Sequence, residues 1–484
     1  MNLKVISRNV GLALLVSALF MLLSVFVSMA HGNDSALAAL LISFAITFTV
    51  GIFPFIFVRK VPAISLKDGY MIVFLSWILS FIFGMLPYAL WGGPFSVANA
   101  WFESVSGFTT TGATILEDIE ALPPSLLFWR SSTHFIGGLG VVVFLLLIIP
   151  SSSPVKFRLT SMELSSLSKE GYKTRSNRII FIFASVYICI FIASFFSYLI
   201  AGMGPFDAVN HAFSVSATGG FSTRNLSIGY FDSVAIDLIT IVFMFLSSIH
   251  FGLIYIVVVQ RTLKPLRNPV LGFYFVTLIL ISVVSGISLK LQTPDLSLGT
   301  AFLQSSFHVV SYASTTGFAI GDNSTWPMLP CFLLLVASMF CGCAGSTTGG
   351  LKIDRAVVLG KCVERHVRKI ISPSSVTEIR FGNQILHEED VYPHVLYIAM
   401  YFLVMGMSVI FCLMTGDPNG HAFTGTISSL GTVGPSLGSI GSLGNYNAEP
   451  VAMKLIFSLD MFLGRVEIFP VLAVFSVIFH RSRK

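Results

Sequence analysis

Long apolar stretches separated by short polar segments form the dominant pattern of this chain. Most of these stretches approach or exceed the roughly 20 residues that a helix needs to cross the hydrocarbon core of a bilayer. The pattern predicts an all-α polytopic membrane protein with about ten spans, near residues 10–30, 36–58, 70–91, 126–149, 179–202, 234–259, 270–291, 327–344, 392–415 and 452–479.

A second pattern repeats within this frame. Four times a Ser is followed four residues later by a Thr and six residues later by a Gly, just after a short amphipathic segment. The glycines lie 108, 97 and 117 residues apart, which indicates four divergent repeats of similar length. The copies are Ser106/Thr110/Gly112, Ser214/Thr218/Gly220, Ser311/Thr315/Gly317 and Ser428/Thr432/Gly434.

Each repeat has the layout of a span, a short helix that re-enters the membrane, a Thr/Gly loop, a polar outer turn and a second span. We expect the short helices near residues 98–108, 206–216, 303–313 and 421–430. The expected fold is four helix/pore-loop/helix repeats in a pseudo-fourfold arrangement around one pore, preceded by two extra transmembrane helices. The boundaries are 1–60 for the two N-terminal helices and 61–150, 151–262, 263–380 and 381–484 for the repeats.

The Thr/Gly loops suit a cation pathway for two physical reasons. The C-terminal end of a helix carries a partial negative charge, so four short helices aimed at one cavity favour a cation. Glycine permits the positive φ angles that let backbone carbonyls line an axis and replace the water shell of an ion. For a single copy, packing of small residues between helices is the better explanation. Four copies at similar spacing favour a selectivity filter.

Composition and charge support the membrane assignment. With 54% hydrophobic and 11% charged residues, the chain does not suit a soluble domain. The net charge of +6 does not indicate nucleic-acid binding, because 24 of the 29 Lys and Arg residues fall on one predicted side. The positive-inside rule then puts both termini in the cytoplasm, with all four loops entering from outside. The six cysteines fall mostly in or beside spans and indicate neither a disulfide framework nor a metal site.

Two features in the second half of the chain are candidates for a gate. The segment 342–350 is too polar and glycine-rich for a lipid-facing helix, so we expect a broken helix in which Gly345 and Gly349 allow movement beneath the filter. A simple packing kink is the alternative. Arg465 lies in mid-span, where a charge is costly and usually functional. We expect it to act as a positive barrier in the pore, or alternatively to pair with Asp460 or a carbonyl.

Several other polar residues fall within or near the repeats. We expect Glu103 and His308, both in the short helices, to hydrogen-bond the loops. Asp207 and Asp322 are expected near the outer mouth, where they could attract cations. No function is assigned to a further set, Arg130, His134 and Lys290.

The filter segments resemble a known family. TTTGAT at Thr109, ATGGFST at Ala217, STTGF at Ser314 and TVGPSLG at Thr432 are similar, in order, to the four filter segments of the potassium transporter superfamily that contains TrkH, TrkG and KtrB. GCAGSTTGGLK from Gly342 and FLGRVEIFP from Phe462 resemble segments of the TrkH/TrkG branch, although Thr348 replaces a usual glycine.

This resemblance implies the membrane subunit of a bacterial potassium uptake system, located in the inner membrane and acting as a homodimer. It also implies regulation by a cytosolic, nucleotide-binding TrkA-type subunit, with K⁺ as the transported ion and no catalytic cofactor. Glycine at position 112 argues for potassium, since members that admit sodium often carry Ser there. The implied filter ligands are Thr110, Thr111, Gly112, Thr218, Gly219, Gly220, Thr315, Thr316, Gly317, Thr432, Val433 and Gly434.

Three classes of function are compatible with a polytopic membrane protein. A membrane enzyme needs a clustered nucleophile, base or metal set, and the sequence shows none. An alternating-access carrier should show inverted repeats and several buried ionisable groups, whereas these repeats run in one orientation. A filter-type potassium pathway is favoured. Proton- or sodium-coupled symport and less selective cation transport remain the alternatives.

Overall fold

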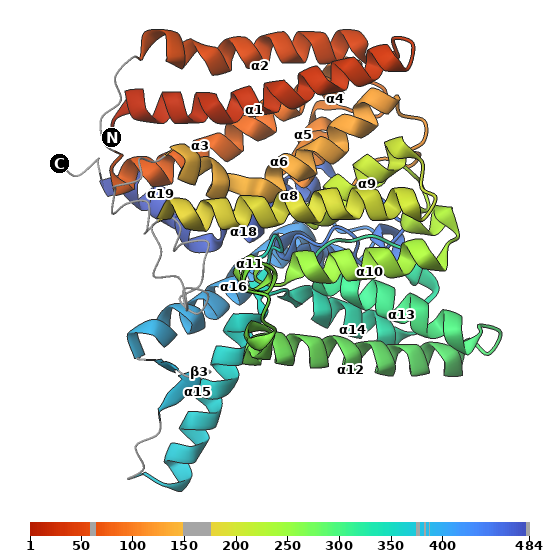
Figure 1. Cartoon of the computed structure of the whole chain (residues 1–484), viewed down its shortest axis with the longest axis vertical. Coiled ribbons are helices and arrows are strands. Elements are labelled where there is room, and N and C mark those ends of the chain that lie inside the picture. The colour runs from red at the N-terminus through yellow and green to blue at the C-terminus, as the bar shows by residue number, and fades with distance from the viewer. Residues whose placement is uncertain (59–63, 149–175, 374–377, 382–383, 387, 481–484) are drawn as a thin grey trace.

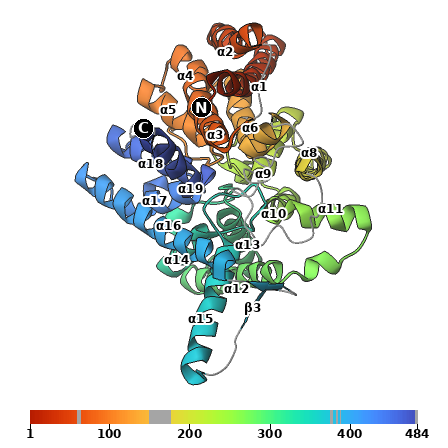
Figure 2. The same cartoon turned by 90° about the vertical axis from the view of Figure 1, so that its left-hand side faces the viewer.

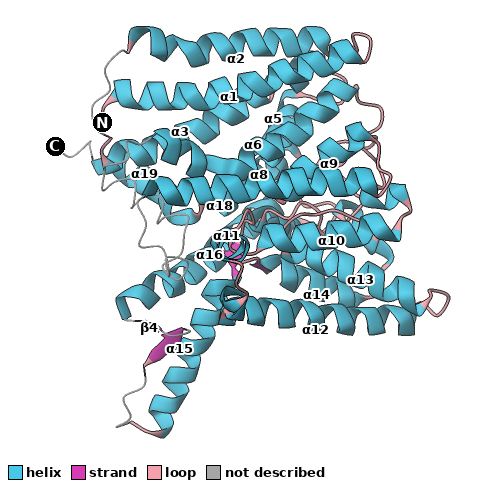
Figure 3. Ribbon diagram, viewed as in Figure 1, coloured by secondary structure: helices cyan, strands magenta, loops and turns pink. Residues whose placement is uncertain are grey.

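The computed structural model describes residues 1–58, 64–148, 176–373, 378–381, 384–386 and 388–480. Helices make up most of this part of the chain, and the longest of them run in roughly the same direction (Figures 1 and 3). Two short pairs of strands complete it. β1 (Phe340–Cys341) pairs in parallel with β2 (Leu351–Lys352), and β3 (Ile379–Phe381) pairs antiparallel with β4 (Gln384–Leu386).

The first two helices, α1 (Leu3–Ala30) and α2 (Leu37–Phe57), pack together at one edge of the molecule (Figures 1 and 2). They approach closely where Gly11 faces Gly51, since a Cβ on Gly11 would lie only 2.6 Å from the Gly51 carbonyl oxygen. Small residues at such a crossing let two helix backbones come together. α2 leaves Phe53 and Phe57 exposed, as expected for side chains that face lipid.

The remaining helices fall into four consecutive groups, named group 1 to group 4 below. Group 1 contains α3 (Leu66–Gly84), α4 (Leu86–Trp91), α5 (Val97–Phe108) and α6 (Pro124–Ile148). Group 2 contains α8 (Ser176–Ile200), α9 (Pro205–Ala217), α10 (Val234–Ser248) and α11 (Phe251–Gln260). Group 3 contains α12 (Pro269–Gln292), α13 (Leu298–Ala313), α14 (Met328–Met339) and α15 (Ile353–Ile371). Group 4 contains α16 (Glu388–Met414), α17 (Ala422–Gly431), α18 (Val451–Val466) and α19 (Ile468–His480).

The short helices α5, α9, α13 and α17 lie where the sequence predicts them, and they surround the central loops (Figure 2). Their starts follow from local capping. The hydroxyls of Ser96 and Ser297 accept hydrogen bonds from backbone N–H groups in the first turns of α5 and α13. α9 begins with Pro205, whose missing N–H is not needed at that position.

The spans agree only in part with the prediction. In the described part of the chain, six helices are long and apolar enough to cross a membrane, or seven if the bent pair α10–α11 counts as one span. The apolar stretches predicted as spans at 234–259, 327–344 and 452–479 are not single continuous helices. α10 and α11 meet at 103°, α14 ends at Met339, and α18 and α19 are separated at Glu467.

Local backbone features explain these interruptions. Between α10 and α11, Ile249 is extended, and the His250 ring caps α11 by accepting a hydrogen bond from the N–H of Gly252. Glu467 adopts a φ of 68° between α18 and α19, and Gly140 adopts a φ of 57° within α6. Together with the loop after α14, these breaks interrupt the last long helical stretch of every group.

Two basic residues in the second half of the chain are enclosed by the fold. Lys352 and Arg355, which are among the Lys and Arg residues predicted on one side, are both buried beside the loop that precedes α15. Among the other predicted inner-side charges, those at 59–60, 156–175 and 481–484 lie outside the described residues. The start of α1 and α19 lie at the same end of the molecule in Figure 1, as expected for termini on one side.

Candidate functional site

The four Thr/Gly loops begin directly at the C-terminal ends of α5, α9, α13 and α17, and they share one backbone conformation. The Thr of the repeated Ser/Thr/Gly motif has a φ between 53° and 56° in each loop, although a non-glycine residue in this left-handed region costs about 1–2 kcal/mol. Two residues later each glycine has a φ between 77° and 93°. The same strained geometry occurs at Thr110/Gly112, Thr218/Gly220, Thr315/Gly317 and Thr432/Gly434.

The repeated Ser holds each loop in this shape. Its carbonyl oxygen accepts a backbone hydrogen bond from the residue after the strained Thr, at 2.8–2.9 Å in all four copies. In three copies its hydroxyl also donates across the loop, from Ser214 to the Phe221 carbonyl, from Ser311 to the Phe318 carbonyl and from Ser428 to the Gly434 carbonyl. The Ser of the repeated motif is therefore a scaffold for the loop carbonyls.

The loops contact one another in a closed cycle. A Cβ added to the glycine of each loop would lie well under 3.0 Å from a carbonyl oxygen of the next loop, a distance that real side chains do not adopt. A larger residue at any of these four positions would therefore force the neighbouring loop to shift. The facing pairs are Gly112 with Gly219, Gly220 with Thr316, Gly317 with Val433, and Gly434 with Thr111.

A pocket lies over this cycle and is lined by all four loop glycines. Its wall also includes Glu117, Asn225 and Ser442 from the turns that follow the loops. These turns are tied to one another: Asn225 donates to Asp118 at 2.8 Å, and this hydrogen bond lowers the pKa of Asp118 below its ordinary value. The pocket therefore lies directly against the four loop glycines and the turns that follow the loops.

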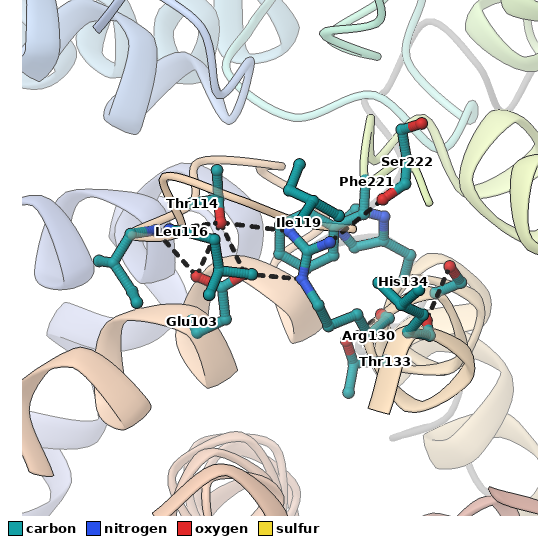
Figure 4. Close-up of polar contacts among 12 residues, drawn as sticks. Glu103, Thr114, Leu116, Ile119, Arg130, Thr133, His134, Phe221 and Ser222 are labelled. Carbon is teal, nitrogen blue, oxygen red and sulfur yellow. Dashed lines mark hydrogen bonds and ion pairs between the residues drawn. The ribbon is translucent and has the colours of Figure 1, made fainter. Parts of the chain in front are cut away.

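Behind the first two loops lies a fully buried ion pair (Figure 4). Glu103 on α5 accepts hydrogen bonds from the Thr114 hydroxyl and the Ile115 N–H, as expected for a residue that holds its loop. Arg130 on α6, to which the sequence assigned no function, lies 2.8 Å from Glu103 and stacks over the ring of Phe221. A charged residue inside a span was the signal that could have identified Arg130.

The equivalent positions of the next two groups hold histidines. His211 and His308 lie nine residues before their loop glycines, as Glu103 does. His211 Nε2 lies 2.9 Å from the Ser222 hydroxyl, and His308 Nε2 lies 3.1 Å from the Gly321 carbonyl oxygen. The expected structural role of His308 therefore agrees with its contacts.

The remaining polar residues of the prediction also have structural partners. Asp207 forms an ion pair with Arg224 at 2.8 Å, and Asp322 caps a short turn through the N–H of Ser324. His134 stacks on Phe221 beside the second loop. Lys290 donates to two carbonyls just beyond the end of α12. All of these contacts are made with other residues of the chain.

The segment 342–350 leaves the helical path, as its glycines predict, and packs against the loops. The N–H of Gly349 lies 3.3 Å from the Thr315 hydroxyl, and a Cβ on Gly349 would collide with the side chain of Thr432. The Thr347 hydroxyl lies 3.2 Å from the carbonyl oxygen of Ser216 at the end of α9. This segment thus contacts elements of groups 2, 3 and 4 at once.

Arg465 connects this segment to group 1. Its guanidinium donates to the Thr347 carbonyl and, at 2.9 Å, to the carbonyl of Gly137 on α6. The alternative of a carbonyl contact is therefore observed, whereas Asp460 accepts from Ser408 instead. Close by, Glu467 forms an ion pair with Arg355 at 2.7 Å. Both arginines hold the structure around the segment 342–350.

Apolar helices of spanning length surround a cycle of polar backbone loops, and a pocket lies over that cycle. These features are typical of a membrane protein of the ion-transport class. The family model TrkH, described as "Cation transport protein", matches residues 37–483. The chain belongs to this family.

Curated relatives and a solved structure agree with this assignment. The chain is 33% identical to "Trk system potassium uptake protein TrkH" of Halomonas elongata and 31% identical to the protein of that name from Escherichia coli K12, over all of both chains in each case. It also matches "Crystal Structure of the Potassium Transporter TrkH from Vibrio parahaemolyticus", with a TM-score of 0.88 and 31% identity over 98% of both chains.

Proposed function

We propose that this protein takes up potassium across the bacterial inner membrane through a selectivity filter lined by backbone carbonyls. The observation that carries the proposal is the closed cycle of four loops with matching left-handed Thr and Gly residues. Such strain persists where the surrounding structure over-determines it, and it is concentrated at functional sites. The names of the full-length relatives, which are potassium uptake proteins, support potassium as the ion.

In this proposal the loop carbonyls replace the hydration shell of the ion. Four helix C-terminal ends point toward the same loops and add a favourable field for a cation. The four groups then act as four repeats around one pore, with α1 and α2 as additional helices. The proposed ligands are the carbonyls of Thr110, Thr111, Gly112, Thr218, Gly219, Gly220, Thr315, Thr316, Gly317, Thr432, Val433 and Gly434.

The segment 342–350 acts as the gate. It packs against the Thr side chains of two loops, and Arg465 fastens its Thr347 carbonyl to α6. Gly345, with a φ of 77°, and Gly349 allow the segment to rearrange. Arg465 contributes both a link that holds the segment closed and a positive charge that opposes cation entry.

The cellular context of the proposal follows the family. The protein functions as a homodimer in the lipid bilayer, with both termini in the cytoplasm and a TrkA-type nucleotide-binding subunit bound on that side. A negative membrane potential provides about 2.3 kcal/mol per 100 mV for each inward-moving cation. Coupling to protons or sodium is not needed for uptake in this scheme.

Growth at limiting potassium, in a bacterial strain without its own potassium uptake systems, tests the proposal. Wild-type protein should restore growth and catalyse uptake of K⁺ in preference to Na⁺. Gly112→Ser should lose this preference, because its Cβ would displace the Gly219 carbonyl. Failure of well-expressed wild-type protein to take up K⁺ would refute the function. Uptake that depends strictly on a proton or sodium gradient would favour symport.

A further inference from the structure

A second set of backbone carbonyls lies just beyond the filter loops, two residues after each loop glycine. Each of these four carbonyls accepts a hydrogen bond from a helix group other than its own. The donors are the Tyr446 N–H to Thr114 at 2.8 Å, the Arg130 guanidinium to Ser222 at 3.2 Å, the Gly229 N–H to Ala319 at 3.1 Å and the Tyr312 hydroxyl to Ser436 at 2.9 Å.

These four hydrogen bonds share one direction around the molecule. Group 1 donates to group 2, group 2 to group 3, group 3 to group 4, and group 4 back to group 1. The loop glycines face their neighbours in the same order. The chemistry of the donors differs, with two backbone N–H groups, one guanidinium and one phenol. The position of the acceptor, by contrast, is the same in all four copies.

We propose that these four bonds form a belt that sets the spacing of the filter loops, and that Arg130 and Tyr312 are positioning residues for ion selectivity. The inference rests on the proposed filter function. Selectivity in a carbonyl-lined filter depends on cavity size or on the number and field of the carbonyls. Both properties change if one loop is released from its neighbour, because the belt carbonyl is only two residues from the loop glycine.

Arg130 is the charged member of the belt and is only 1% exposed. Its Nε pairs with Glu103, Nη2 donates to the Thr114 hydroxyl, and Nη1 reaches the Ser222 carbonyl (Figure 4). One planar side chain therefore links the backbone segments that follow the glycines of the first two loops. A lysine could keep the charge beside Glu103, but it lacks the fork that makes several bonds at once.

Tyr312 plays the corresponding part between groups 3 and 4. It lies on α13, is fully buried, and donates its hydroxyl proton to the Ser436 carbonyl. The Tyr312 hydroxyl oxygen itself accepts a hydrogen bond from the Asn323 side chain at 2.6 Å, and the same amide donates to the Ser436 carbonyl at 3.4 Å. Removing only the Tyr312 hydroxyl, as in Tyr312→Phe, keeps the ring and its packing while it removes the shorter of these two hydrogen bonds to the fourth loop.

The test compares Tyr312→Phe with a matched control in purified protein reconstituted into vesicles. The control is Tyr198→Phe, which removes a buried hydroxyl that bonds Thr240 at 3.1 Å and contacts none of the belt carbonyls. The K⁺/Na⁺ uptake ratio should fall about fivefold in Tyr312→Phe, as expected for one lost hydrogen bond. It should stay at the wild-type value in Tyr198→Phe.

Arg130→Lys provides a second variant that does not depend on how Tyr312→Phe folds. Its ratio should fall by a similar or larger factor, with K⁺ uptake retained. Unchanged ratios in a folded Tyr312→Phe or Arg130→Lys protein would overturn the belt, and so would an equal fall in Tyr198→Phe. Loss of selective uptake in the wild type would instead refute the filter itself, so the two failures are distinguishable.

Discussion

The sharpest prediction concerns Gly220, the glycine of the second loop. Its φ is +83°, and a Cβ at this position would lie under 3.0 Å from the carbonyl oxygen of Thr316 in the third loop. Gly416, in the turn after α16, is a matched control because its φ is +79° and its Cβ would meet no described atom within 4 Å. The two substitutions to alanine share the backbone strain and differ in the carbonyl contact.

The magnitudes follow from this comparison. Backbone strain at a positive φ costs about 1–2 kcal/mol in both variants. In Gly220→Ala the Thr316 carbonyl oxygen must also move from 2.0 Å to at least 3.4 Å from the new Cβ to reach an ordinary contact distance. Because that carbonyl is a proposed ligand, the K⁺/Na⁺ uptake ratio should fall at least tenfold, which corresponds to about 1.4 kcal/mol of discrimination. Gly416→Ala should leave the ratio unchanged.

Two measurements on reconstituted protein distinguish the effect of backbone strain from the effect of the carbonyl contact. Thermal unfolding shows whether both variants are folded and similarly destabilised, and uptake of K⁺ and Na⁺ into vesicles gives the ratio. A folded Gly220→Ala protein with the wild-type ratio would refute the assignment of these carbonyls to the filter. An equal loss of selectivity in Gly416→Ala would show that strain alone causes the effect.

Three further predictions concern the gate. Arg465→Ala removes the tie to the segment 342–350, so uptake in vesicles should rise several-fold, and an unchanged or lower rate in folded protein would contradict the barrier role. Gly345→Ala introduces backbone strain of about 1–2 kcal/mol beside His250. The fraction of molecules with an open pathway should change by up to about tenfold, without a change in the K⁺/Na⁺ uptake ratio. A changed ratio at unchanged flux would refute this prediction. Glu467→Gln removes the carboxylate that pairs directly with Arg355 and should lower the free energy of unfolding by about 3 kcal/mol, measured by thermal or denaturant unfolding. Unaltered stability would contradict the pairing.

The sequence predicts the local features of this protein well. The periodic Ser, Thr and Gly residues locate the four short helices and the loops, because left-handed backbone at a fixed distance from a helix end favours glycine. The glycines of 342–350 likewise indicate that the helix there is broken. These features depend on residues close together in the chain, so a repeated local pattern is enough to find them.

The contacts between distant segments were harder to predict. Hydropathy alone favours continuous spans at 234–259 and 452–479, since the bend before His250 and the break at Glu467 lie within apolar surroundings. Charge patterning gives no sign that Lys352 and Arg355 are enclosed, yet the fold buries both beside the segment 342–350. Arg130 was seen as a charge in a span, but its partner Glu103 lies on another helix.

Direct observation of the bound ion tests the central claim. The structure of the protein should be determined experimentally in the presence of Rb⁺ or Tl⁺, both electron-rich substitutes for K⁺. The account predicts ion density enclosed by the four loops, between Gly112, Gly220, Gly317 and Gly434, and absence of that density in Na⁺ alone. Ion density elsewhere in the molecule, with none among these loops in Rb⁺ or Tl⁺, would contradict it.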